Sequence, residues 1–291
     1  MDSGRRHEFD HLGNVDFNST VIEQNLQAGY YACTEPNGNI VIRNLKRESM
    51  QWNDIRDDFW ADTSKFYPFC NNFNFQYMEM YHWAESMPFS CDYEKDGCHI
   101  KEGDVIVDVG ANIGMFSRLA IERGASKVYA FEPSMDAMKC LLLNVDRSIV
   151  DVHKSCLYSH TGFIDIRVTK DSFPMASIDD HREISNVENV SCYTIDDLIE
   201  FGVLPERIDF MKVDVEGSEC HVFEGLSNSN LANIDRLAVE THHHPEGHVL
   251  HDEENILSLL QRLSNAFPHN KQLQYGAGGV GSWTQTINCW R

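Results

Sequence analysis

The sequence has little positive charge and no cluster of it. Its 24 lysine and arginine residues stand against 45 aspartate and glutamate residues, which gives a formal net charge of −21 at pH 7. No basic run is longer than the pair at Lys46-Arg47. A chain this negative repels phosphate backbones, so we expect no nucleic acid as partner or substrate.

Long apolar runs and paired cysteine motifs are also missing. No stretch reaches the ~20 apolar residues of a membrane-spanning helix, and no apolar segment follows the first residues as it would in a secretory signal. The nine cysteines are scattered and never spaced Cys-x-x-Cys, which argues against a disulfide framework or a structural zinc site. These absences predict a cytoplasmic protein without a membrane span.

The chain changes character near residue 99. Residues 1–98 are irregular and rich in aromatic side chains, with a hairpin predicted around Asn37-Gly38 between arms at Gly29–Thr34 and Asn39–Arg43. Aromatic side chains at this density fill cores and line pockets alike. We therefore expect an N-terminal accessory or cap region that either packs on the main domain, residues 99–291, or forms a wall of its pocket.

After residue 99 the pattern alternates between short apolar strands and helices. This alternation predicts an α/β fold, a doubly wound and mostly parallel sheet covered on both faces, with ligands bound at the carboxyl ends of the strands. The predicted strands are Val105–Val109, Val128–Phe131, Asp151–His153, Ile208–Val215 and Leu237–Glu240, with a hairpin at Cys156–Val168 and a loop at Asp171–Asn189. The predicted helices are Gly114–Arg123, Ser134–Asn144, Asp196–Phe201, Ser218–Leu226 and Glu253–Ala266.

A strand, a glycine turn and a helix make the strongest local motif. Asp108 ends the strand, and Gly110, Asn112 and Gly114 form the turn. The glycines let the backbone approach a ligand, and the new helix offers free N–H groups. A dinucleotide site requires G-x-G-x-x-G, whereas here Asn112 stands in place of the middle glycine. An acidic residue two positions before the first glycine suits a cationic cofactor without phosphate.

The next strand also ends in an acidic residue. Glu132 follows Phe131, where a carboxylate can accept hydrogen bonds from both hydroxyls of a ribose. The alternative interpretation is structural, with Asp108 and Glu132 capping the helices that follow them. Two successive strands that both end in an acid favour the cofactor interpretation.

Four segments carry a resemblance to a known family: Asp108–Gly114, Phe131–Pro133, Ile208–Glu219 and Leu237–His242. Together they resemble the FkbM-type methyltransferases, in the family's order and spacing. The resemblance covers about residues 99–245, and the Lys-Val-Asp-Val-Glu-Gly stretch is its most specific part.

The resemblance implies a class I methyltransferase fold, Rossmann-like, whose seven-stranded sheet ends in an antiparallel strand. Ser282–Cys289 can supply that strand. It also implies S-adenosyl-L-methionine as cofactor and O-methylation of a hydroxyl on a sugar or other small natural product. The partner is then a small-molecule or carbohydrate acceptor. The cofactor-binding residues it implies are Asp108, Gly110, Asn112, Gly114 and Glu132.

An alcohol needs a nearby base to become a good nucleophile, and the chain offers several candidates. Lys212, Asp214 and Glu216 share one face of a predicted central strand, where three charges are costly unless they are paired or used. A Lys212–Asp214 ion pair and a capping role for Glu216 are the structural alternatives. For Glu219, stabilisation by the helix dipole is a sufficient explanation.

His242 is the other candidate base, since histidine titrates near neutral pH. The sequence does not separate it from Asp214. His242-His243-His244 could also suggest a metal, but consecutive histidines cannot all point at one ion, and we expect no metal site. The alternatives left open are a metal-dependent hydrolase using Asp214, Glu216 and His242, an NAD-dependent oxidoreductase, and a non-catalytic binding protein on the same fold.

Overall fold

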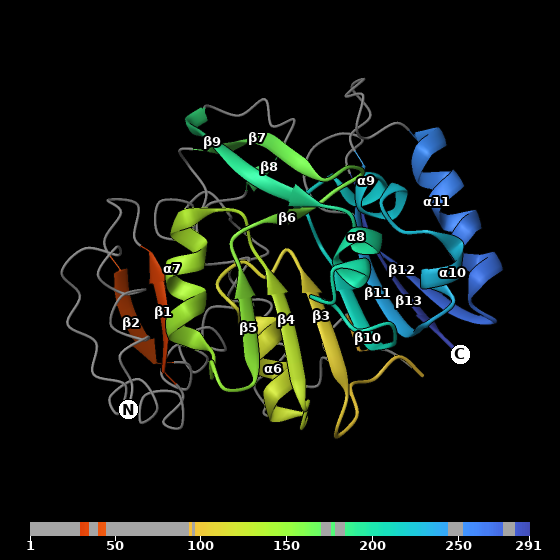
Figure 1. The fold of residues 1–291 in the computed structure, drawn as a ribbon, viewed down its shortest axis with the longest axis horizontal. Helices are drawn as coiled ribbons and strands as arrows, with labels where there is room; N and C mark the ends of the chain where they lie inside the picture. Colours follow the sequence, from red (N-terminus) through yellow and green to blue (C-terminus); the bar gives the residue numbers. More distant parts are fainter. Residues whose placement is uncertain are drawn as a thin grey trace, which may run out of the picture.

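The computed structural model describes residues 30–34, 40–44, 93–94, 97–169, 176–177, 184–243, 253–275 and 283–291. Its centre is a seven-stranded sheet in the order β12-β13-β11-β10-β3-β4-β5 (Figure 1). The strands are β3 (Val105–Val109), β4 (Lys127–Phe131), β5 (Val150–His153), β10 (Ile208–Val213), β11 (Ile234–His243), β12 (His269–Tyr275) and β13 (Trp283–Trp290).

Strand direction in this sheet matches the predicted class. The neighbouring pairs from β11 through β10, β3 and β4 to β5 are parallel, whereas β13 is antiparallel to both β11 and β12. The predicted antiparallel strand at Ser282–Cys289 is therefore confirmed, displaced by one residue at each end. The doubly wound, mostly parallel sheet that the resemblance implied is the fold of this chain.

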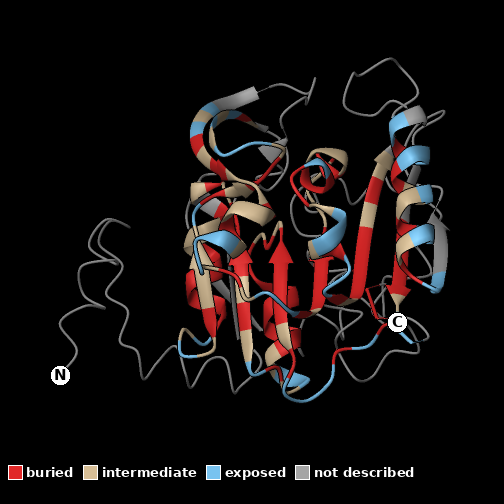
Figure 2. Ribbon diagram, turned by 45° about the vertical axis from the view of Figure 1, so that its right-hand side comes forward, coloured by how far each residue is buried: buried red, intermediate tan, exposed pale blue. Residues whose placement is uncertain are grey.

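Helices cover the two faces of the sheet because the central strands are apolar on both sides. Ile106 of β3 belongs to the core under α6 (Met115–Glu122) and α7 (Met135–Asn144). Its neighbours Val107 and Val109 belong to the core on the other face. That face carries α8 (Ile195–Glu200), α9 (Glu219–Glu224), α10 (Asn228–Leu231) and α11 (Glu253–Ala266). Figure 2 shows the central strands buried and the exposed residues on outer helix surfaces.

No helix among the described residues is both long and apolar enough to cross a membrane.

A second, four-stranded sheet lies over the carboxyl ends of β3, β4 and β5 (Figure 1). Its order is β6-β9-β7-β8, from β6 (Cys156–Leu157), β7 (Gly162–Thr169), β8 (Ala176–Ser177) and β9 (Ile184–Tyr193). The predicted hairpin at Cys156–Val168 is wrong, because β6 pairs in parallel with β9 and not with β7. The predicted loop also ends too late, since the polar stretch from Ile184 pairs antiparallel with β7, which satisfies its backbone.

The N-terminal region is described only in part. The predicted hairpin arms are confirmed as β1 (Tyr30–Thr34) and β2 (Ile40–Asn44), paired antiparallel, while the turn at Asn37-Gly38 lies outside the described residues. Tyr93 and Cys98 are buried in the core beneath α6. The described residues just before position 99 therefore pack as part of the α/β domain.

A buried ion pair joins the start of the domain to its central sheet. Arg236 of β11 donates two hydrogen bonds to Asp104, from Nη1 at 2.8 Å and from Nη2 at 2.9 Å, and both side chains are buried. A buried charge that loses its partner is strongly destabilising. This pair therefore makes the stability of the sheet depend on the segment that enters it.

We expect Arg236→Ala to lower the free energy of unfolding by about 3 to 5 kcal/mol, because Asp104 would stay buried without its partner. Urea unfolding followed by circular dichroism measures this. Arg207→Ala is the matched control, since Arg207 is 70% exposed and pairs with Asp235 at the surface, where such pairs contribute at most about 1 kcal/mol. Equal losses in the two variants would contradict the prediction.

Candidate functional site

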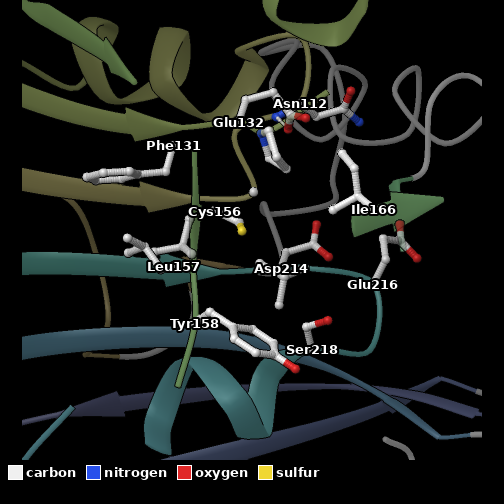
Figure 3. Close-up of a pocket in the computed structure, with 14 residues that line it drawn as sticks. Asn112, Phe131, Glu132, Cys156, Leu157, Tyr158, Ile166, Asp214, Glu216 and Ser218 are labelled. Atoms are coloured by element: carbon white, nitrogen blue, oxygen red, sulfur yellow. Dashed lines mark hydrogen bonds between the residues drawn. The ribbon is translucent and has the colours of Figure 1, made fainter. Parts of the chain in front are cut away.

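A pocket opens at the carboxyl ends of β3, β4 and β10, under the second sheet. It contains about 700 Å³ of empty space, counting the part open to solvent. Figure 3 shows Asn112 and Glu132 together on one side of this space and Asp214 and Glu216 on the other. The lining residues are Val109, Gly110, Asn112, Phe131, Glu132, Pro133, Cys156, Leu157, Tyr158, Ile166, Asp214, Val215, Glu216 and Ser218.

The turn after β3 requires glycine at two positions, because there is no room for a side chain there. Gly110 has a φ of 78°, and a Cβ at this position would lie 1.8 Å from the carbonyl oxygen of Asp214. Gly114 has a φ of 89°, and its Cβ would lie 2.4 Å from Leu141. Both glycines thus let protein pack against protein, and of the two only Gly110 lines the pocket. Asn112 adopts a left-handed φ of 51° between them.

Asp108 lies behind this turn and is not among the pocket-lining residues. It is fully buried, accepts a 2.6 Å hydrogen bond from the Ser117 hydroxyl and lies 3.5 Å from the Lys212 ammonium. Burial raises the pKa of Asp108, and the Lys212 and Ser117 contacts oppose this rise. Lys212 also donates a 2.7 Å hydrogen bond to the carbonyl oxygen of Gly110. Asp108 and Lys212 therefore hold the turn from below.

Glu132 both supports the turn and faces the pocket. Its Oε2 accepts a hydrogen bond from the Asn112 N–H at 2.8 Å, and its Oε1 accepts one from the Ser134 N–H at 2.7 Å. Ser134 is the N-cap residue of α7, but its hydroxyl makes no capping bond. Burial raises the pKa of Glu132 to about 7. Each carboxylate oxygen keeps a further lone pair for a ligand.

Asp214 is the acidic residue nearest the middle of the pocket. Strand β10 ends at Val213, so Asp214 and Glu216 stand in a turn and not on the strand face predicted for them. Glu216 takes a left-handed φ of 52°. The Oδ2 of Asp214 lies 3.6 Å from the Lys212 ammonium, while its Oδ1 is buried without a hydrogen-bond partner among the described residues.

His242 is held between carboxylates. Its Nδ1 lies 2.9 Å from Oε1 of Glu219, and its Nε2 lies 3.4 Å from Glu216 and 3.9 Å from Glu240. Burial works to lower the pKa of His242, but Glu216 and Glu219 outweigh it and hold the pKa well above its ordinary value. The neighbouring carboxylates therefore favour the protonated imidazole. The helix-dipole explanation of Glu219 missed this contact, which no local pattern indicates.

Two residues that lie beside Asp214 and His242 were not among the predicted site residues. Tyr93 contacts both Asp214 and Glu240 through its hydroxyl, at 2.9 and 2.7 Å. Burial, followed by the neighbouring Asp214 carboxylate, raises the pKa of Glu240 to about 7. The motif containing His242 already included Glu240, and its position at the end of the predicted strand Leu237–Glu240 was the available signal. Tyr93 lies before every motif in the sequence, and no sequence pattern indicated a role for it.

Asp214, Glu216 and His242 each offer one ligand atom, and these atoms lie within 4.8 Å of one another. A metal requires the neutral imidazole, whereas both nitrogens of a protonated histidine carry hydrogens. The carboxylates around His242 favour the protonated form. An ion bound by these three residues would therefore have to displace a proton from His242.

Comparison with known proteins identifies the family. The model of the methyltransferase FkbM domain matches residues 108–267, more than half of the chain. The match includes Glu132, Asp214 and His242, and Tyr93 lies outside it.

Two curated relatives carry the same kind of domain. The hexuronic acid methyltransferase AglP of Haloferax volcanii is 34% identical over 146 residues, 49% of this chain and 57% of the relative. The 31-O-demethyl-FK506 methyltransferase FkbM of Streptomyces tacrolimicus is 28% identical over 181 residues, 52% of this chain and 70% of the relative. The chain thus spans a little over half the length of the first of these.

Among solved structures, the methyltransferase FkbM of Methylobacillus flagellatus KT is 19% identical with a TM-score of 0.43. The match covers 65% of this chain and 44% of that one.

The crowding at Gly110 yields a stability prediction. Gly110→Ala should unfold at a markedly lower urea concentration than Gly103→Ala. Both glycines have positive φ, 78° and 87°, so both variants carry the strain of about 1 to 2 kcal/mol that a side chain brings there. Only the Cβ at Gly110 meets backbone, since nothing lies within 4 Å of a Cβ at Gly103. Similar unfolding midpoints would disprove the close contact with Asp214.

Proposed function

The chain belongs to the methyltransferase FkbM domain family, and we propose that it is an S-adenosylmethionine-dependent O-methyltransferase acting on a sugar or other small natural product. The observation that carries this proposal is the pairing of Glu132 and Asp214 across one pocket. In this proposal Glu132 binds the ribose of the cofactor, and Asp214 takes the proton of the acceptor hydroxyl.

The cofactor side suits a ligand that is positively charged and has no phosphate. None of the fourteen pocket-lining residues is lysine or arginine, and three are acidic. The free lone pairs of Glu132 accept the two ribose hydroxyls, while Gly110 and Asn112 form the wall beside them. Asp108 and Gly114 contribute from behind, by bracing the turn and by starting α6. When bound, the cofactor supplies a methyl group on a positively charged sulfur.

Asp214 is the base in this proposal. Methyl transfer is an in-line displacement, so the enzyme's main task is to hold an acceptor oxygen behind the methyl carbon. The Asp214 carboxylate, which lines the pocket, would accept the hydrogen of that hydroxyl and take its proton as the new carbon–oxygen bond forms and the bond from the methyl carbon to sulfur breaks. We assign the role of base to Asp214 and not to His242, because the surrounding carboxylates favour the protonated form of His242. It orients Glu216 instead.

The acceptor is inferred from the site and from the relatives. Glu216 lines the pocket beside Asp214, so two carboxylates are available to accept hydrogen bonds from a compound with several hydroxyls. One relative is named for a hexuronic acid and the other for a demethylated natural product. Both names agree with a hydroxylated small molecule as acceptor.

Thermal unfolding with separate ligands tests the cofactor. S-adenosylmethionine or S-adenosylhomocysteine at 100 times its dissociation constant should stabilise the protein by about 2.7 kcal/mol. This raises the unfolding midpoint by roughly 5 °C or more, whereas NAD should leave it unchanged. Glu132→Gln should lose most of the shift, and Glu122→Gln, changed at a half-exposed side chain of α6, should keep it. Stabilisation by NAD alone would refute the proposal.

Asp214→Asn should lower the rate of methyl transfer by about 10²- to 10⁴-fold, the usual contribution of a positioned base. The affinity for S-adenosylhomocysteine should stay within a few-fold of the parent. Mass spectrometry of methyl transfer to hexuronic acid and neutral hexose glycosides measures the rate, and calorimetry measures the affinity. Asp151→Asn, at the half-exposed partner of Lys127, is the matched control. An Asp214→Asn enzyme of normal rate would remove Asp214 from the chemistry.

A further inference from the structure

One pocket-lining residue comes from strand β7 of the second sheet. Ile166 is 2% exposed and belongs to the pocket lining, and Figure 3 shows it at the edge of the space, between Asn112 and Glu216. The lining residues Cys156 and Leu157 form β6, which a short link joins to the end of β5. Strand β7 is not linked directly to a strand of the main sheet, so another contact must fix the position of Ile166.

Ile166 has an acidic neighbour on the adjacent strand. Strands β7 and β9 are antiparallel, and Ile166 pairs with Glu188 in their register. Directly opposite residues place their side chains on the same face of a sheet, so Glu188 points from the second sheet to the same side as Ile166. The next residue, Asn189, lies on the other face, where it is exposed and donates a hydrogen bond to Asp165 at 2.7 Å.

Glu188 contacts the start of α7, which precedes it by 53 residues. Its Oε2 accepts a hydrogen bond from the N–H of Met135 at 3.4 Å. Met135 is the first residue of α7, where the helix offers no backbone partner for an N–H group. The N-cap residue Ser134 makes no side-chain capping bond. Glu188 therefore supplies the acceptor, together with a negative charge that the start of a helix favours.

The start of α7 is also part of the pocket wall. Glu132 accepts the N–H of Ser134 at 2.7 Å, and both Glu132 and Pro133 line the pocket. Two successive N–H groups at one helix end thus bind two carboxylates, one in the pocket and one on the second sheet. The bond from Met135 to Glu188 consequently sets the distance between Ile166 and the wall formed by Glu132.

We propose that Glu188 is a positioning residue, which holds Ile166 against the bound cofactor by attaching β9 to the start of α7. Ile166 then closes the pocket on the side of the second sheet and slows the departure of the cofactor. The inference rests on the proposed function for the identity of that cofactor. The attachment itself is made entirely by residues of this chain.

The experiment measures the association and dissociation rates of S-adenosylhomocysteine on the immobilised full-length protein by surface plasmon resonance. Glu188→Ala and Ile166→Ala should each raise the dissociation rate by about 3- to 10-fold, the effect of losing one contact. The association rate should stay within about two-fold, since such losses appear mainly in dissociation. Asn189→Ala is the matched control, because it removes a side-chain bond from the other face of β9, and it should keep the parent rates.

The double variant Glu188→Ala/Ile166→Ala separates positioning from general loosening. If Glu188 acts through Ile166, the double variant should dissociate about as fast as Ile166→Ala alone. Two effects that multiply, or a Glu188→Ala protein with the parent dissociation rate, overturn the inference.

If Glu188→Ala does not fold, Glu188→Gln decides. The glutamine keeps an oxygen acceptor but loses the charge, so the dissociation rate should still rise by about two-fold or more, and an unchanged rate overturns the inference. Failure of the proposed function gives a different result, because the parent protein would then not bind S-adenosylhomocysteine, which overturns both proposals.

Discussion

Lys212 stands in the middle of the sheet with its ammonium 2.7 Å from the Gly110 carbonyl oxygen, 3.5 Å from Asp108 and 3.6 Å from Asp214. Its side chain is almost fully buried, so the charge is tolerable only with these partners in place. One partner, Gly110, belongs to the glycine turn, and another, Asp214, lies beyond the end of β10. The same ammonium therefore sets the position of the two halves of the site relative to each other.

Negative charge is the second constraint on this region. Asp214, Glu216, Glu219 and Glu240 converge around one imidazole, and like charges this close cannot all remain ionised without compensation. Three effects compensate for the negative charge, and each acts on a different part of this group. Glu216 and Glu219 favour the protonated form of His242, Lys212 faces Asp214, and burial favours the neutral form of Glu240.

Much of this arrangement was accessible from sequence, because parallel strands place their carboxyl ends together. The positions of Gly110, Glu132 and Asp214 followed from that rule and from the resemblance. The sequence could not predict contacts between residues far apart in the chain, because such contacts follow no local periodicity. Tyr93 reaches Asp214 over 121 residues, and Glu219 reaches His242 across two elements. The parallel pairing of β6 with β9 was missed for the same reason, since adjacent polar strands look like a hairpin and a loop.

The two bonds of Tyr93 also bear on how the molecule is made. They close loops of 121 and 147 residues. Contacts between residues so far apart form late in folding, because closing the loop costs chain entropy before the contact stabilises the fold. During synthesis, the glycine turn and Glu132 leave the ribosome before Glu240 does. The group of acids around His242 is consequently complete only when β11 joins the sheet, and until then the growing chain contains the glycine turn without that group.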